Sequence, residues 1–200
     1  ISRHFPTAMS EVRKADLKSG DWALIMGASG GLGSCLVQLV RMNGARVIAA
    51  AGADERVEAA LSLGAEFGVN YRKQKLSEEV KGLTDGRGVD VVFDNIGDPI
   101  LWEEAYACLA PDGKLVTAGA HGGGMVTLDV RRLYQRRLSV IGGIGLETRD
   151  DFRYALELAA AGKVQALIDS ILPLVEAPAA HVLVDQNQTV GKVLLDPSLS

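Results

Sequence analysis

A glycine-rich turn around residue 30 constrains the fold of this chain more than any other feature of its sequence. The apolar run 22–26 leads directly into the turn, and residues 31–43 carry apolar side chains at the spacing of an amphipathic helix. A second apolar run, 46–50, follows. Strand, glycine turn, helix and strand in this order predict a βαβ unit, and a turn in this position is typical of phosphate-binding sites.

The residues of the glycine turn have different structural roles. Gly30 lets the backbone approach a pyrophosphate, and Gly33 lets the helix pack closely on the preceding strand. Ala28 stands where a strict G-x-G-x-x-G motif has its first glycine. Alanine is compatible with the motif as long as its φ angle stays negative, so we expect the phosphate site to be retained. The motif is weak evidence by itself, and the flanking strand and helix strengthen it.

Apolar runs and amphipathic stretches alternate along most of the chain. The predicted strands are 22–26, 46–50, 66–70, 89–93, 114–117 and 138–142. The predicted helices between them are 31–43, 54–63, 77–84, 99–109 and 129–136. This regular alternation predicts an α/β fold of Rossmann type: a doubly wound parallel sheet of about six strands, in the order 3-2-1-4-5-6, with helices on both faces.

The two ends of the chain extend this pattern. Residues 8–15 predict a helix, so we divide the chain into a lead-in helix within 1–20 and one domain over 21–200. Residues 150–161 predict a further helix. Pro173 and Pro178 are expected to bracket a short strand and a helix start, and 192–195 predicts a final strand. We expect the last residues to end on the edge of the sheet.

Composition excludes several classes of partner. The net charge of −4 argues against nucleic acid or an anionic membrane, because both require a basic surface. No apolar run reaches the roughly 20 residues of a membrane span. Cys35 and Cys108 are far apart and outside any C-x-x-C pair, so we expect buried thiols in a reducing cytoplasm. The three histidines are scattered, so we expect no zinc site in this chain.

One alternative for the turn is a short-chain dehydrogenase. That family requires a Tyr-x-x-x-Lys pair on a helix much further along the chain than the glycine turn. Tyr71 and Lys75 have this spacing, but they come soon after the turn, at the end of a predicted strand on the adenine side of the sheet. We therefore treat the match as accidental.

The chain resembles the medium-chain dehydrogenases/reductases, nearest to the quinone-oxidoreductase and zinc-type alcohol-dehydrogenase-like members. The matching stretches are GASGGLGSCLVQLVRMNGARVIAAAG, LGAEFGVNYRK, TDGRGVDVVFDNIGD, LAPDGKLVTAGAHGG and AHVLVDQNQTVGKVLL. They occur in the family's order and spacing and span nearly the whole chain. The resemblance implies the cofactor-binding domain of an NAD(P)H-dependent oxidoreductase that transfers hydride to or from a carbonyl, alcohol or activated alkene.

The resemblance also implies a missing part. Members of the family begin with a GroES-like domain, which holds most of the substrate site and any catalytic zinc, and 1–20 resembles the helix leading out of it. The small-molecule substrate would therefore be held through the missing domain. We name no catalytic residue in this chain and expect it to bind cofactor with little or no turnover by itself.

Two other functions fit the same domain. One is a non-catalytic NAD(P)H-binding or interaction module, and the other is an enoyl-reductase module of a multienzyme synthase. The first would be a chain that exists without a catalytic partner, and the second would need flanking carrier or ketoreductase domains, of which the sequence shows nothing.

The resemblance favours NADP(H) over NAD(H). Ala51, followed by Gly52, stands where NAD-specific members carry an acidic residue for the ribose 2′-hydroxyl. Arg56 and Tyr71 match residues that lie beside a 2′-phosphate in quinone-oxidoreductase-like members. A third basic residue of some relatives is Asn187 here, which weakens the prediction. Asp54 could instead bind a ribose hydroxyl, which is the NAD(H) interpretation.

The remaining candidate residues also come from the resemblance, and they lie at carboxyl ends of predicted strands, where open α/β sheets bind ligands. The glycine turn would hold the pyrophosphate through Ser29, Gly30, Gly31, Leu32 and Gly33. The adenosine and nicotinamide sides would be formed by Asn95, Ile96, Gly97, Ala118, Gly119, Ala120, Gly142 and Gly143. His121 could titrate beside the nicotinamide, but an exposed loop histidine is the simpler interpretation.

The predicted strand 138–142 suggests a homodimer. This strand would lie at the edge of the sheet, and its sequence, LSVIGG with the following IG, is apolar and uncharged. Exposed edges of this kind are normally paired or covered. Relatives often dimerise through this edge, so we expect the same here.

Overall fold

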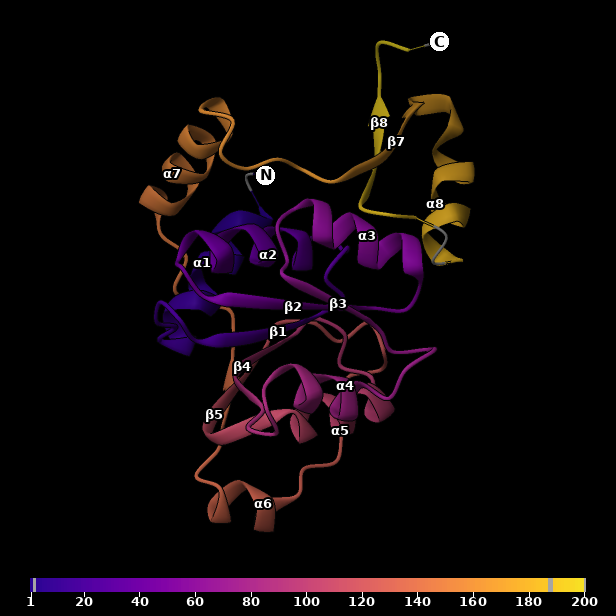
Figure 1. The fold of residues 1–200 in the computed structure, drawn as a ribbon. Coiled ribbons are helices and arrows are strands. Elements are labelled where there is room, and N and C mark those ends of the chain that lie inside the picture. Colours follow the sequence, from indigo (N-terminus) through magenta and orange to yellow (C-terminus); the bar gives the residue numbers. More distant parts are fainter. Residues whose placement is uncertain (2, 187–188, 200) are drawn as a thin grey trace.

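The protein is built around one six-stranded parallel sheet with the order β3-β2-β1-β4-β5-β6 (Figure 1). The computed structural model describes residues 1, 3–186 and 189–199. The strands are β1 (Trp22–Met26), β2 (Arg46–Ala51), β3 (Phe67–Asn70), β4 (Val89–Asp94), β5 (Leu109–Thr117) and β6 (Ser139–Gly142). This confirms the predicted sheet, because its strand order is the one expected for a doubly wound fold.

Helices cover both faces of the sheet (Figure 1). The helices are α1 (His4–Ala15), α2 (Gly33–Met42), α3 (Asp54–Ser62), α4 (Leu76–Leu83), α5 (Pro99–Ala107), α6 (Val130–Gln135), α7 (Arg149–Ala160) and α8 (Ala177–Asp185). In Figure 1, α1, α2 and α3 lie on one face and α4 and α5 on the other. Most predicted boundaries are within two residues of these, and α1 begins earlier than the predicted 8–15.

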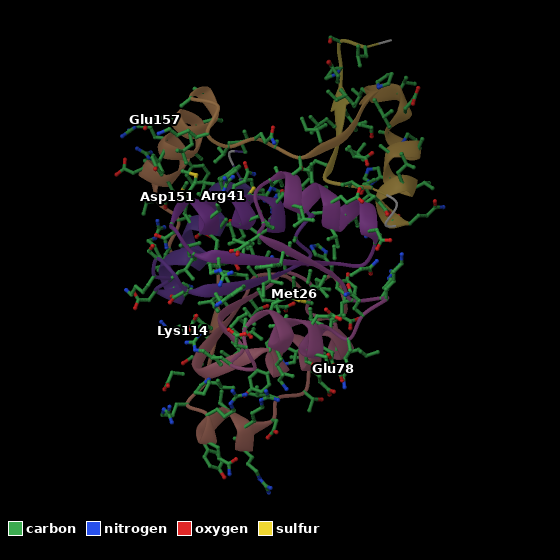
Figure 2. All side chains as sticks on the ribbon, in the orientation of Figure 1. Met26, Arg41, Glu78, Lys114, Asp151 and Glu157 are labelled. Atoms are coloured by element: carbon green, nitrogen blue, oxygen red, sulfur yellow. The ribbon has the colours of Figure 1, made fainter. Side chains whose placement is uncertain are left out.

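The sheet separates two hydrophobic clusters. Side chains of β1 alternate between them: Ile25 packs with α1 and α2, whereas Leu24 and Met26 pack with α4 and α5. Met26 has no exposed surface and lies in the interior, where Figure 2 labels it. Burial on both faces explains why these strands are continuous apolar runs. The carboxyl ends of all six strands consequently meet at one edge of a rigid layer.

The C-terminal part forms a separate sheet, which corrects the expectation that the last residues end on the edge of the main one. β7 (Ile168–Pro173) pairs in parallel with β8 (Lys192–Asp196), and the pair projects beyond α3 (Figure 1). The cause is the path after α7. Gln165 exchanges hydrogen bonds of 2.8 and 3.0 Å with the side chain of Gln38 on α2. This crossing carries β7 away from β6.

The segment between the two prolines also differs from its prediction. The strand precedes Pro173 instead of following it, and a 3₁₀ turn, η1 (Leu174–Glu176), leads directly into α8. Proline in the first turn of α8 needs no N–H donor there, which is why Pro178 is compatible with the helix start.

The helix α1 is tied to the start of α7. Arg13 donates two hydrogen bonds to the carboxylate of Asp151, at 2.7 and 2.8 Å. Asp151 also forms a capping box with Thr148. These contacts lower the pKa of Asp151 to about 2, chiefly through the bond from Arg13.

We predict that Asp151→Asn destabilises the protein at neutral pH. Because the folded pKa is depressed, the stabilisation is present above the ordinary pKa near 3.8 and is lost as pH falls toward 2. Solvent screening at the partly exposed Arg13 reduces the effect to about 1–2 kcal/mol. Urea unfolding at several pH values measures it. Asp150→Asn is the matched control, because the Asp150–Arg153 pair is exposed; equal losses in both variants would contradict the prediction.

Candidate cofactor site

The glycine turn is closed by direct contact between two stretches of backbone. Gly27 has a φ of +63°, which glycine adopts without strain. A Cβ atom on Gly33 would lie 2.2 Å from the carbonyl oxygen of Gly27 and 2.9 Å from the Cα of Ala28. Only glycine therefore allows α2 to begin this close to the end of β1. Ala28 is not among the residues with positive φ, as the sequence argument required.

The N-terminus of α2 is open toward a cleft. Within the described part of the chain no side chain caps this helix end, so its partial positive charge is available to an anion. The N–H groups of Ser34 and Cys35 are bonded to the carbonyl oxygens of Gly30 and Leu32, which leaves the N–H groups of the turn before them to meet a ligand. A Cβ on Gly31 would lie 2.3 Å from the Nζ of Lys192 and 3.3 Å from the Nε2 of His4. The first residue of β8 thus places an ammonium group over the turn.

His4 stays neutral beside this lysine. Burial, followed by the charge of Lys192, lowers the pKa of His4 to about 4. Neither residue was among the sequence-based candidates. The sequence shows the GKVLL run that contains Lys192, but no local pattern indicates that the last strand returns to the glycine turn.

A second part of the cleft lies where β2 and β3 end. A Cβ on Gly52 would lie 3.0 Å from the hydroxyl of Tyr71 and 3.2 Å from the Nε of Arg72. Arg56, from α3, also lines the cleft. Burial raises the pKa of Tyr71, while the charges of Arg72 and Arg56 oppose the shift. The phenol is therefore a neutral hydrogen-bond donor between two cations.

Asp54 is turned to other partners. Asn70 donates a hydrogen bond of 2.6 Å to its Oδ1, and Lys73 forms an ion pair with its Oδ2. Both contacts lower the pKa of Asp54, with the Lys73 bond the larger cause. Asp54 is not among the residues that line the cleft.

The end of β4 is organised by a buried carboxylate. Asp94 accepts hydrogen bonds from the backbone N–H groups of Ile96 and Gly97, at 3.2 and 3.1 Å, and from the hydroxyl of Thr117. Burial raises the pKa of Asp94. The resulting turn directs Asn95 to the carbonyl oxygen of Met26, 3.1 Å away. The Oδ1 of Asn95 is buried and has no partner among the described residues.

The turns after β4, β5 and β6 pack side by side. A Cβ on Gly97 would lie 2.7 Å from the oxygen of Gly119, and one on Gly119 would lie 2.1 Å from the oxygen of Asn95. A Cβ on Gly143 would in turn lie 3.1 Å from that of Ala118. These glycines allow three strand ends to form one continuous surface that extends from the cleft.

The cleft has a volume of about 340 Å³. Its lining residues are Gly27, Ser29, Gly30, Gly31, Gly33, Ala51, Gly52, Arg56, Tyr71, Asn95, Ile96, His121, Val184, Thr189, Gly191 and Lys192. The structure thus brings the candidates of the glycine turn, β2, β3 and β4 together, and His121 joins them. Leu32 belongs to the turn but packs partly into the core. Gly97, Ala118, Gly119, Ala120, Gly142 and Gly143 do not line the cleft; they belong to the adjoining turns, in which Gly97 and Gly143 are buried. Asn187 lies outside the described residues.

These residues fit a dinucleotide. The glycine turn leaves room for phosphate groups against the uncapped N-terminus of α2, and the partnerless Oδ1 of Asn95 is an acceptor for a hydroxyl of the ligand. Arg56 and Lys192 supply positive charge at two points of the cleft. Fold and site together define a nucleotide-binding domain of α/β type.

Comparison with known proteins identifies the family. The zinc-binding dehydrogenase family matches residues 31–161. An NAD-dependent alcohol dehydrogenase of Sulfolobus acidocaldarius is 33% identical over 94% of this chain and 54% of its own length. A 2-haloacrylate reductase of Burkholderia sp is 32% identical over 90% of this chain and 57% of its own length. The chain belongs to the zinc-binding dehydrogenase family, as the dinucleotide-binding domain of its medium-chain oxidoreductases.

Solved structures agree with this assignment. The alcohol dehydrogenase of Aeropyrum pernix has a TM-score of 0.87 and 30% identity, over 96% of this chain and 55% of that one. The chain spans about half the length of the curated relatives it matches.

The described residues hold no group of three or more His, Cys, Asp and Glu side chains that could bind a metal ion. Tyr71 and Lys75 do not form a catalytic pair, since Lys75 is exposed and bonded to Glu78. Among the described residues no helix is long and apolar enough to cross a membrane.

We predict that Gly33→Ala separates α2 from the end of β1. The new methyl group would meet backbone that cannot rotate away, so we expect a loss of about 1–3 kcal/mol in unfolding free energy and much weaker dinucleotide binding. Urea unfolding and calorimetric titration measure both. Gly82→Ala on α4 is the control, since its Cβ meets open space and alanine favours helix. Wild-type stability and affinity in Gly33→Ala would refute the close contact.

Proposed function

We propose that this domain binds NADP(H) in preference to NAD(H) and serves an oxidoreductase that transfers hydride to or from a carbonyl, alcohol or activated alkene. The dinucleotide would supply the reactive C4 of its nicotinamide ring. The chain's own residues orient it: the glycine turn and Lys192 hold the pyrophosphate, and Asn95 accepts from a ribose hydroxyl. The turns at Ala118–Ala120 and Gly142–Gly143 lie beneath the nicotinamide end.

The pair of arginines beside Tyr71 supports the NADP(H) preference most. Arg56 and Arg72 flank a neutral phenol at Gly52, and Ala51 replaces the carboxylate that would repel a 2′-phosphate. Asp54, the residue that could bind a free ribose hydroxyl, is held by Asn70 and Lys73. The NAD-dependent name of one relative makes this preference a property to be measured.

We predict that calorimetric titration gives tighter binding of NADPH than of NADH. Arg56→Ala should weaken NADPH binding at least about tenfold, since a hydrogen bond to a charged group contributes roughly 1.5–3 kcal/mol. NADH binding should change little. Arg41→Ala removes the same charge from α2 outside this cleft and is the control. Tighter NADH binding would overturn the preference. Binding of neither would indicate either that the missing domain is needed to close the site or that the fold serves interaction alone.

The C-terminal part of this chain has an exposed apolar surface on which a substrate domain could pack. Large apolar side chains are exposed on β7, η1, α8 and β8: Ile168, Ile171, Leu174, Val175, Val182, Leu194 and Leu195. Contiguous exposed apolar residues typically mark a protein interface. We propose that the GroES-like domain implied by the family packs here and holds the small-molecule substrate next to the cleft.

We propose a cytoplasmic location from the state of the thiols. Cys35 and Cys108 are free and buried, and burial raises the pKa of each to about 12. Unreactive, unpaired thiols are typical of a reducing compartment.

We propose a homodimer formed through β6. Among the described residues this strand has β5 as its one neighbour in the sheet, and Val140 on it is exposed. Sedimentation should give a mass twice the chain's 21.2 kDa. Val140→Asp should give monomers, and Ile100→Asp, which alters an exposed residue on α5, should not. A monomeric wild type would reject the proposal.

A further inference from the structure

Glu11 on α1 is a buried carboxyl group that neither the glycine turn nor the cofactor cleft uses. It has no exposed surface, and neither Oε1 nor Oε2 has a hydrogen-bond partner among the described residues. Burial raises its pKa to about 8, and the nearby charges of Asp94 and Glu147 act in the same direction. The side chain is therefore neutral below that pH.

Glu11 lies directly against the turn that follows β6. A Cβ on Gly143 would lie 2.6 Å from the Cγ of Glu11 and 3.1 Å from its Cδ. Gly142 and Ile144, on either side, are exposed to solvent. The turn thus packs against Glu11 on one side and is exposed to solvent on the other.

Helix α1 holds this turn through three other side chains. Ser10 donates a hydrogen bond of 2.8 Å to the carbonyl oxygen of Gly143 and accepts one from the N–H of Leu146. Lys14 donates to the carbonyl oxygens of Gly142 and Ile144, and Arg13 donates to that of Leu146. The position of residues 142–146 therefore depends on α1, with Glu11 at the centre of the contact.

The charges around Glu11 oppose its ionisation. The charged groups that face it from α1 and from the elements around it are Asp94 (β4), Glu147 (before α7), Asp151 (α7), Lys114 (β5), Arg41 (α2), Arg13 and Lys14. The other charged residues of α7 and β5 are exposed: Arg149, Asp150, Arg153, Glu157 and Asp112. Arg13 is engaged by Asp151, Lys14 by backbone carbonyls, and Lys114 by the carbonyl oxygen of Ala15. An ionised Glu11 would therefore be a buried charge beside another carboxylate, with its nearest cations committed elsewhere.

We propose that Glu11 is a positioning residue for the nicotinamide end of the cofactor: its neutral side chain supports residues 142–146, and its ionisation displaces them. Asp94 is fixed by turn amides, whereas the turn on the other side of Glu11 is exposed at Gly142 and Ile144, so the strain is relieved by displacement of that turn. The inference rests on the proposed function, because it needs the nicotinamide to bind at Gly142–Gly143. It predicts that alkaline pH weakens binding of that end alone.

The test is calorimetric titration of wild type and Glu11→Gln with NADPH and with 2′-phospho-ADP-ribose, which lacks the nicotinamide. Between pH about 7 and about 9.5, NADPH should bind wild type roughly tenfold more weakly, as one proton linked at pKa 8 allows. Affinity for 2′-phospho-ADP-ribose should not change. Glu11→Gln, which stays neutral, should lose the pH dependence. Glu157→Gln, an exposed change on α7 (Figure 2), should keep it.

Hydrogen exchange of the wild type provides a second readout that needs no variant. The amides of 142–146 should lose protection above pH 8 after correction for intrinsic rates, while those of the glycine turn should not. Equal pH slopes in wild type and Glu11→Gln, or unchanged protection, would overturn the role of Glu11. Failure of both ligands to bind at any pH would instead overturn the proposed function.

The ionisation of Glu11 should also change how the stability of the folded protein depends on pH. The folded pKa lies above the unfolded value of 4.5, so wild-type stability falls as pH rises from about 4.5 to about 8. Glu11→Gln lacks this loss, so its melting temperature should rise relative to wild type across that window. A constant difference would show that Glu11 is not neutral in the folded protein.

Discussion

The approach of Gly33 to the backbone of Gly27 is the contact on which the rest of the molecule depends. With 2.2 Å between a Cβ at position 33 and the oxygen of residue 27, the helix axis can point at the end of β1 only if no side chain intervenes. The same geometry opens the N-terminus of α2 toward the cleft. The close packing of α2 and the recognition of an anion at its N-terminus therefore both require glycine at position 33.

The turns after β4, β5 and β6 also pack closely because they contain glycines. Gly97 and Gly119 each bring backbone against a neighbouring strand end at distances that exclude a Cβ, whereas Gly143 packs against the side chain of Glu11. Asp94 supplies the polar partner that these closely packed amides need. The ligand surface is consequently made largely of main chain. Its shape is determined by strand order and glycine positions more than by side-chain rotamers.

The features predictable from sequence were those with a local pattern. Most strands of the main sheet are apolar runs beside helices, so the parallel sheet followed from period and spacing, and its order from the doubly wound fold type. The first part of β5, LAPDG, is not an apolar run, and the prediction began only at 114. The location of β8 did not, because 192–195 predicts a strand without predicting its partner. The hydrogen bonds between Gln38 and Gln165 decide that, and they join residues far apart in sequence.

The residues of the site likewise fall into two groups: those that the sequence reveals and those that only the tertiary structure reveals. The glycine turn, Arg56 and Tyr71 carry motif signals that sequence alone reveals, whereas Lys192 reaches the cleft through tertiary structure. Glu11 is the clearest example. An acidic residue on an amphipathic helix ordinarily faces water, and only the packing of α1 against the turn after β6 makes it a buried, neutral group.

The return of β8 to the glycine turn links the last residues of the chain to its first ligand-binding element. Lys192 follows the main sheet by about 50 residues, yet its ammonium lies over Gly31. Proteolytic trimming behind α8 would therefore remove a cation from the pyrophosphate end of the cleft while leaving all six strands of the main sheet intact. A folded product of such cleavage would lose the β7–β8 pair, keep the main sheet and be a poorer ligand-binding protein.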